Sequence, residues 1–180
     1  MTGRPEIGEY ATYYEKYVRL VPDGDIAETL ARQFDDSLRV YRDISSEQSG
    51  FSYAPGKWTI RQLLGHVSDA ERVFQYRAVA FARGETKPLP GFDQDIWMQG
   101  VDFDARNWDS LVDELSLVRA STVALFRSLG DAALSRRGVA SDNPVSVRAL
   151  GYITAGHERH HLSILQTSYL ASPSYPVPSS

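Results

Sequence analysis

The sequence predicts an all-α fold, a four-helix bundle with a long crossover between its second and third helices. Four segments carry apolar residues at the three-to-four spacing of an amphipathic helix. Residues 85–107, between the second and third of these segments, show no sustained period and contain Pro88, Pro90, Gly91 and Gly100. A connection this long lets two successive helices of a bundle run parallel. Patterns typical of β-strands are weak throughout.

Each predicted helix is bounded by residues that favour a helix end. Asp25 and Ser146 can cap the exposed amides of the first and fourth helices, and Thr59 opens the second. Gly84 can take the left-handed conformation that ends the second helix. In chain order, the predicted helices span about 25–43, 59–83, 108–129 and 146–169.

Composition narrows the class of protein. At 180 residues the chain fits one domain, which we place at residues 1–170, followed by a flexible tail rich in Pro and Ser at residues 171–180. The net charge is −4 and no long basic run occurs, which argues against nucleic acid as a partner. No stretch approaches the ~18 apolar residues of a membrane span, and the N-terminus lacks the apolar core of a signal peptide. We therefore expect a cytoplasmic protein with no membrane partner.

The histidines are the most informative residues. The chain has four histidines, and three of them lie within residues 157–161. His157 and His161 are four residues apart and so share one face of the fourth predicted helix. Imidazole is a common ligand of zinc, nickel, copper and iron. His66, on the second predicted helix, borders its apolar stripe and can supply a third nitrogen, so the sequence predicts a three-histidine metal site.

Other interpretations of the histidines remain. His66 can be a core histidine with its own hydrogen-bond partner, while His157 and His161 bond to carboxylates. His160 is rotated by about 60° from His157 on the helix and is interpreted as a surface or second-shell residue. Residues 157–161 also match the His-Glu-x-x-His pattern of zinc proteases, but the further ligands of those proteases are missing from the sequence that follows.

Carboxylates near the predicted metal site have alternative roles. Glu71 lies on the apolar stripe of the second helix, where a lone carboxylate is costly, and Arg119 on the third helix is its predicted ion-pair partner. Alternatively, Glu71 or Asp69 accepts a hydrogen bond from a ligand imidazole and orients it from the second shell. Asp69 can instead be an exposed helix carboxylate without such a role. Glu158 is expected at the surface or in the second shell rather than as a general base.

Four stretches of the chain resemble the DinB superfamily of metalloenzymes, also called the DinB/YfiT family. They are residues 17–25, 54–74, 89–95 and 156–162, which read YVRLVPDGD, APGKWTIRQLLGHVSDAERVF, LPGFDQD and GHERHHL. The resemblance implies an up-down-down-up four-helix bundle, with a divalent metal ion held by His66, His157 and His161. It also implies a homodimer, and relatives that include thiol-dependent S-transferases and a mycothiol-dependent isomerase.

The leading functional hypothesis is a metal-dependent transferase with two small-molecule partners, a low-molecular-weight thiol and an electrophile. A bound metal ion, with zinc and nickel as the first candidates, would hold the thiol as thiolate. Because the cosubstrate brings the sulfur nucleophile, the protein needs no cysteine of its own, and the chain has none. Asp95, Trp97 and Arg148 are candidates for the mouth of the site. The alternatives are a metal-dependent hydrolase and a non-catalytic, stress-related metal-binding protein.

Overall fold

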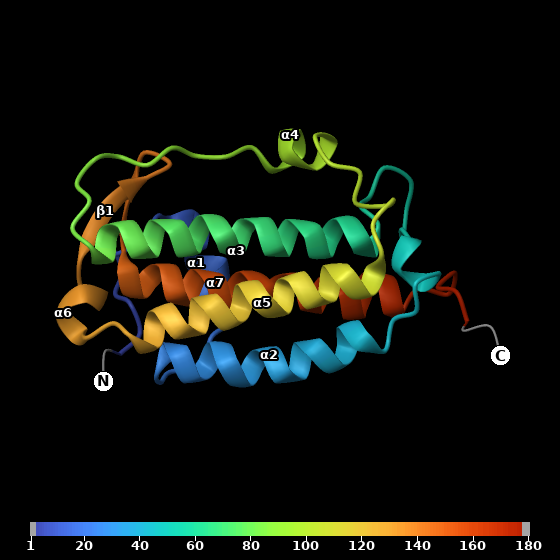
Figure 1. Ribbon diagram of the computed structural model, residues 1–180, viewed down its shortest axis with the longest axis horizontal. Helices are drawn as coiled ribbons and strands as arrows, with labels where there is room; N and C mark the ends of the chain where they lie inside the picture. Colours follow the sequence, from blue (N-terminus) through green and yellow to red (C-terminus); the bar gives the residue numbers. More distant parts are fainter. Residues whose placement is uncertain (1–2, 178–180) are drawn as a thin grey trace.

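The computed structural model describes residues 3–177 and shows the predicted four-helix bundle (Figure 1). Helices α3 and α5 run in the same direction, opposite to α2 and α7, so the topology is up-down-down-up. The long helices are α2 (Ile26–Arg42), α3 (Ile60–Ala82), α5 (Trp108–Arg127) and α7 (Val147–Ile164).

The predicted helix ends are confirmed by the capping contacts. Asp25 accepts a hydrogen bond from the backbone of Glu28, and Ser146 accepts one from the backbone of Ala149. Thr59 and Gln62 form a reciprocal capping box at the start of α3. Asn107 caps α5 in the same way as Asp25 caps α2. These side chains satisfy amide groups that the first turn of a helix leaves unpaired.

A small β-hairpin, which the weak strand patterns did not predict, accompanies the helical bundle. Strands β1 (Arg137–Ala140) and β2 (Asn143–Ser146) pair antiparallel, with Arg137 opposite Ser146. Ser141 and Asp142 both have positive φ, 51° and 61°, as a two-residue turn of this hand requires. Four-residue strands are too short to show a period of two, and the turn lacks the Asn-Gly or Asp-Gly that normally signals it. For these two reasons the hairpin could not be predicted from the sequence.

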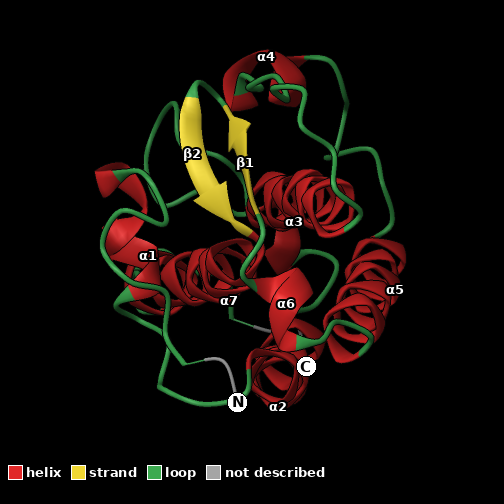
Figure 2. Cartoon of the chain, turned by 90° about the vertical axis from the view of Figure 1, so that its left-hand side faces the viewer, coloured by secondary structure: helices red, strands yellow, loops and turns green. Residues whose placement is uncertain are grey.

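The crossover is tied to this hairpin and is not a free loop. The Leu89 amide donates to the carbonyl of Val139, and the Ser141 amide donates to the carbonyl of Leu89. Beyond that contact lies a short helix, α4 (Gln94–Gln99), which the sequence analysis did not predict. Figure 2 shows the hairpin and α4 on the same side of the bundle, beyond α3.

The remaining short elements cover the ends and sides of the bundle. The short helix α1 (Glu15–Val18) lies against α7 and directly follows a 3₁₀ turn, η1 (Thr12–Tyr14), while α6 (Asp131–Leu134) precedes the hairpin (Figure 2). A second 3₁₀ turn, η2 (Gln48–Gly50), follows α2, and α7 continues as a π-helical segment, η3 (Leu165–Leu170). The fourth helix thus reaches the predicted length, but its last six residues are wound more widely than an α-helix.

Residues 171–177, the described part of the predicted tail, follow η3 and contact the residues just after α2. The Tyr175 ring packs edge-on against Phe51 at a centroid distance of 5.5 Å, and Gln48 donates to the carbonyl of Pro176. The last three residues of that tail, 178–180, lie outside the residues that the structure describes. Over residues 3–177, no helix is both long enough and apolar enough to cross a bilayer.

A polar layer divides the core into two apolar clusters. Along α5, Leu115 belongs to one cluster and Val123 to the other, and the buried Arg119 lies between them. The Arg119 guanidinium pairs with both carboxylate oxygens of Glu71 on α3, at 2.8 Å each, which confirms the predicted ion pair. It also donates to Glu158 on α7 at 2.8 Å. It donates as well to the backbone carbonyl of Leu30 on α2, so all four long helices meet at one cation.

We predict that Arg119→Met destabilises the protein by about 3–5 kcal/mol, because it leaves two buried carboxyl groups without their partner. The measurement is the free energy of unfolding in urea. The matched control is Arg127→Met on the same helix, where the pair with Glu28 is half exposed and is worth at most about 1 kcal/mol. Equal losses in the two variants would contradict this account of the layer.

Candidate metal centre

Three histidines converge where α3 packs against α7. One nitrogen from each of His66, His157 and His161 lies within 4.8 Å of the other two. The Nε2 atoms of His66 and His157 are 3.1 Å apart. The ring centroids of His157 and His161 are 4.5 Å apart, as expected for residues one turn apart on the same helical face. The structure thus brings together the three residues that the sequence analysis proposed as ligands.

The environment keeps these imidazoles neutral. Burial lowers the pKa of His66 to about 4. Burial, together with the neighbouring His66, His160 and Lys16, lowers the pKa of His161 to about 3. The pKa of His157 is well below its usual value, first because of burial and then because of the adjacent histidines. A neutral imidazole carries the lone pair that a metal ligand needs.

The hydrogen bonding of the cluster is incomplete without a further group. The Nδ1 atom of His161 is buried and has no hydrogen-bond partner among the described residues. A buried polar atom without a partner costs about 1–3 kcal/mol. Three neutral imidazole nitrogens in this arrangement form a donor set that suits zinc, nickel, copper or iron. The residues present therefore fit a divalent metal ion.

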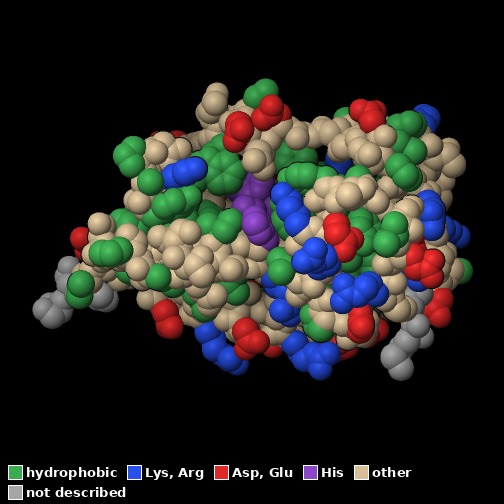
Figure 3. Space-filling view, turned by 180° about the vertical axis from the view of Figure 1, so that it is seen from behind, with side chains coloured by type: hydrophobic (Ala, Val, Ile, Leu, Met, Phe, Trp, Pro, Cys, Tyr) green, Lys and Arg blue, Asp and Glu red, His purple; other side chains and the backbone are tan. Residues whose placement is uncertain are grey.

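A cavity of about 540 Å³ opens beside the triad and has His66 and His157 in its wall. Its other walls come from the N-terminal tyrosines, from Phe74 on α3 and from residues 91–94 of the crossover. Figure 3 shows histidine side chains at the floor of a hollow that is bordered by hydrophobic side chains and, on one side, by a basic side chain. The anchored crossover therefore supplies part of a site to which small molecules have access.

The predicted mouth residues do not line this cavity. Trp97 packs against Phe92 at a centroid distance of 4.8 Å and remains 43% exposed. Asp95 lies in the first turn of α4 and is exposed. Arg148 is bound by the carboxylate of Glu9. The crossover contributes Gly91, Phe92, Asp93 and Gln94 instead.

The tyrosines before and within α1 are site residues that the sequence analysis missed. Tyr13, Tyr14 and Tyr17 line the cavity, and the Tyr17 ring lies 5.3 Å from the His157 ring. The approach of α1 depends on Gly156, since a Cβ atom there would lie 2.1 Å from the carbonyl oxygen of Tyr17. The available signal was the spacing of the tyrosines at three and four residues, next to a glycine that precedes a ligand histidine.

The second-shell candidates take up varied positions. Asp69 is half-buried and pairs with Arg72, also on α3. Glu71 and Glu158 are engaged by Arg119, so the expectation that Glu158 lies at the surface is wrong: it is 1% exposed. Within residues 3–177, none of these carboxylates has a hydrogen bond to a triad imidazole. The Glu158 position also removes the general base that a His-Glu-x-x-His protease requires.

His160 lies next to the triad without belonging to it. It is half-buried, and its ring contacts those of Tyr17 and His161 at centroid distances of 5.3 and 5.2 Å. Burial, and then the charge of Lys16, lowers its pKa. Its position agrees with either a surface or a supporting role, the two that the helix geometry allowed.

Comparison with known proteins connects this centre to a family. Two proteins of Oceanobacillus iheyensis, each named "Putative metal-dependent hydrolase", are 27% and 24% identical over 137 and 153 residues, covering 76% and 78% of this chain and 77% and 87% of their own.

Two solved structures from Bacillus subtilis share the fold, both at 17% identity. YfiT, described as a probable metal-dependent hydrolase with an unusual four-helix bundle topology, has a TM-score of 0.68 over 91% of this chain and 89% of its own. The DinB-like protein YjoA has a TM-score of 0.59 over 86% and 96%. The DinB superfamily profile matches residues 29–165, and the chain therefore belongs to the DinB superfamily.

Proposed function

We propose that this protein is a metal-dependent transferase that joins a low-molecular-weight thiol to an electrophile. The observation that carries the proposal is the convergence of three neutral imidazoles at the wall of a cavity large enough for a small molecule. His66, His157 and His161 would hold zinc or nickel. A divalent ion with a free coordination position lowers the pKa of a thiol or water that binds to it.

The residues around the triad position the reactants. Tyr13, Tyr14 and Tyr17 line the cavity, and Asp93, Gln94 and Ser141 add polar residues to its wall. This mixture suits a thiol cosubstrate with an apolar part and several hydrogen-bonding groups. In the transfer, the sulfur forms a bond to carbon of the electrophile. The leaving group departs with the bonding electrons, and the thiol proton passes to solvent.

The two buried carboxylates nearest the triad in sequence are not free to act as a general base for hydrolysis. In zinc proteases of the His-Glu-x-x-His type, a carboxylate next to the metal acts as general base for the attacking water. Here the two buried carboxylates close to the triad in sequence, Glu71 and Glu158, are held by Arg119. A thiol ionises far more readily than water and needs no such base.

A metal-dependent hydrolase is the second candidate. The names of the two Oceanobacillus relatives support this alternative. Asp93, on the cavity wall, is the carboxylate that would serve as general base for the attacking water.

We predict that His66→Ala, His157→Ala and His161→Ala each lower the affinity for zinc or nickel by more than about 100-fold, because loss of an outer-shell partner alone costs about 10- to 100-fold. Elemental analysis and competition with a chelator, on protein without a histidine tag, measure this. His160→Ala is the matched control on the same helix and should retain the metal. Equal metal content in all four variants would rule out the proposed ligands.

The metal-free protein is expected to lose stability as the pH falls from about 6.5 towards 4. An unfolded histidine has a pKa of about 6.5, whereas that of folded His66 is about 4. The unfolded state therefore binds the proton first, and acid favours unfolding through this interval. The comparison is the free energy of unfolding of wild type and His66→Asn at pH 7 and pH 4.5. The wild type should show the larger decrease, and parallel curves would contradict the argument.

The zinc or nickel form is expected to consume thiol when bacillithiol, mycothiol or glutathione is supplied with an electrophile. The reaction is followed by loss of free thiol and by mass spectrometry of the conjugate. His66→Ala should reduce the rate to the uncatalysed level. Hydrolysis of activated esters without thiol would favour the hydrolase instead, and a bound metal with neither activity would favour a non-catalytic protein.

A further inference from the structure

A second, smaller cavity reaches the same triad at His161. Its volume is about 260 Å³, and its walls include Tyr53, Trp58 and Tyr169 together with Lys57 and Leu63. The larger cavity has His66 and His157 in its wall, so the two cavities border different members of the triad. The Trp58 ring also lies 5.0 Å from the His66 ring, which places this aromatic wall directly beside the cluster.

The aromatic walls are held in place by one another. The Tyr53 and Tyr169 rings pack edge-to-face with centroids 4.7 Å apart. The hydroxyl of Tyr169 donates to the backbone carbonyl of Trp58 at 2.8 Å. Contacts of this kind fix ring orientations before a ligand arrives, which reduces the entropy that binding costs. The cavity is therefore a preformed slot with aromatic faces and edges.

The π-helical segment η3 builds one side of this slot. It starts at Leu165, four residues after His161, and includes Tyr169. Leu165 and Tyr169 are both buried, at 0% and 2% exposure, so both side chains lie on the inner face of this segment. Segments of π-helix occur often at functional sites, since they sacrifice regular hydrogen bonding to place side chains. Here the side chain is that of Tyr169, which forms one wall of the slot.

Charge defines the ligand further. Among the described residues that line the slot, Lys57 is a cation and none is a carboxylate. Lys57 is exposed, as expected for a group at the entrance. Aromatic walls select a flat, apolar body, and a single ammonium group selects an anionic substituent. The matching ligand is an aromatic molecule that carries a carboxylate or a similar anion.

We infer that the slot formed by Tyr53, Lys57, Trp58 and Tyr169 binds the second substrate, an aromatic electrophile with an anionic substituent. The inference rests on the proposed transferase function. The larger cavity, which is lined by tyrosines and by polar residues of the crossover, takes the thiol. Two cavities that meet at one histidine cluster are what a two-substrate reaction requires, because both reactants must reach the same centre together.

Binding of a simple probe tests the slot without any turnover. The probe is 4-nitrobenzoate, with neutral 4-nitrobenzamide as its matched analogue, titrated by calorimetry into the zinc-loaded protein and into the metal-free protein. Lys57→Gln should weaken 4-nitrobenzoate about 3- to 10-fold and leave 4-nitrobenzamide unchanged. Lys57→Arg should restore the binding. Tyr53→Ala should weaken both probes by about tenfold.

Phe92→Ala, in the wall of the larger cavity, is the positional control and should leave both probes unchanged. Probe binding that is lost in Phe92→Ala but insensitive to Lys57 and Tyr53 would overturn the inference, as would no binding at millimolar concentration. Such a result together with metal-dependent thiol consumption would refute the slot and leave the transferase. The expected variant effects without any thiol consumption would establish the slot and refute the transferase.

Discussion

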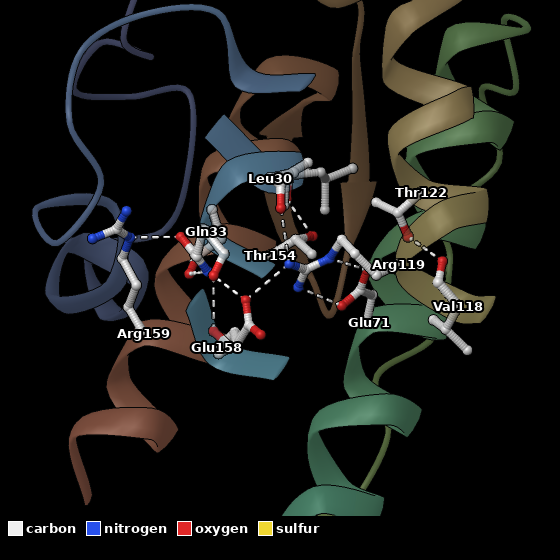
Figure 4. Close-up of polar contacts among 12 residues, drawn as sticks. Leu30, Gln33, Glu71, Val118, Arg119, Thr122, Thr154, Glu158 and Arg159 are labelled. Carbon is white, nitrogen blue, oxygen red and sulfur yellow. Dashed lines mark hydrogen bonds and ion pairs between the residues drawn. The ribbon is translucent and has the colours of Figure 1, made fainter. Parts of the chain in front are cut away.

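The buried guanidinium of Arg119 is the constraint on which the arrangement of the site depends. It pairs with Glu71 on α3 and with Glu158 on α7, the two helices that carry the histidines (Figure 4). Glu158 directly follows His157, and Glu71 lies little more than one turn after His66. Any rotation or sliding of α7 relative to α3 would therefore break a buried, charge-assisted contact before it separated the imidazoles. Breaking such a contact is costly because the groups left behind are desolvated.

Gln33 on α2 fixes the rotation of α7 in a second way. Its amide nitrogen donates to the carbonyl of Ala155 and to Glu158, and its oxygen accepts from Arg159 (Figure 4). Three points along α7 are held by one side chain. With Glu158 turned toward the bundle centre, His157 lies about 100° around the helix, facing α3 and α1. The same polar layer that interrupts the core thus aims the metal ligands.

The parts of the molecule that sequence could predict are those with a long period or a strong local signal. The caps at Asp25 and Ser146, the i, i+4 histidines and the Glu71–Arg119 pair all follow from spacing and from the cost of burying charge. The hairpin was missed because its Ser141-Asp142 turn lacks glycine. The inward position of Glu158 could not be found from its own helix, because its partners lie on α2 and α5. The role of the N-terminal tyrosines depends on tertiary packing at Gly156.

Keeping carboxylates away from the triad has a chemical consequence. Neutral imidazoles leave the charge of a bound divalent cation undiminished, whereas a carboxylate ligand would offset part of it. Arg119 holds both Glu71 and Glu158 on the bundle side of their helices, and burial keeps the three imidazoles uncharged. A centre of this kind stabilises an anion that enters from the cavity, and the thiolate of the proposed cosubstrate is such an anion, as hydroxide is. The ion pair inside the bundle therefore helps to keep the positive charge of the proposed centre available to such an anion.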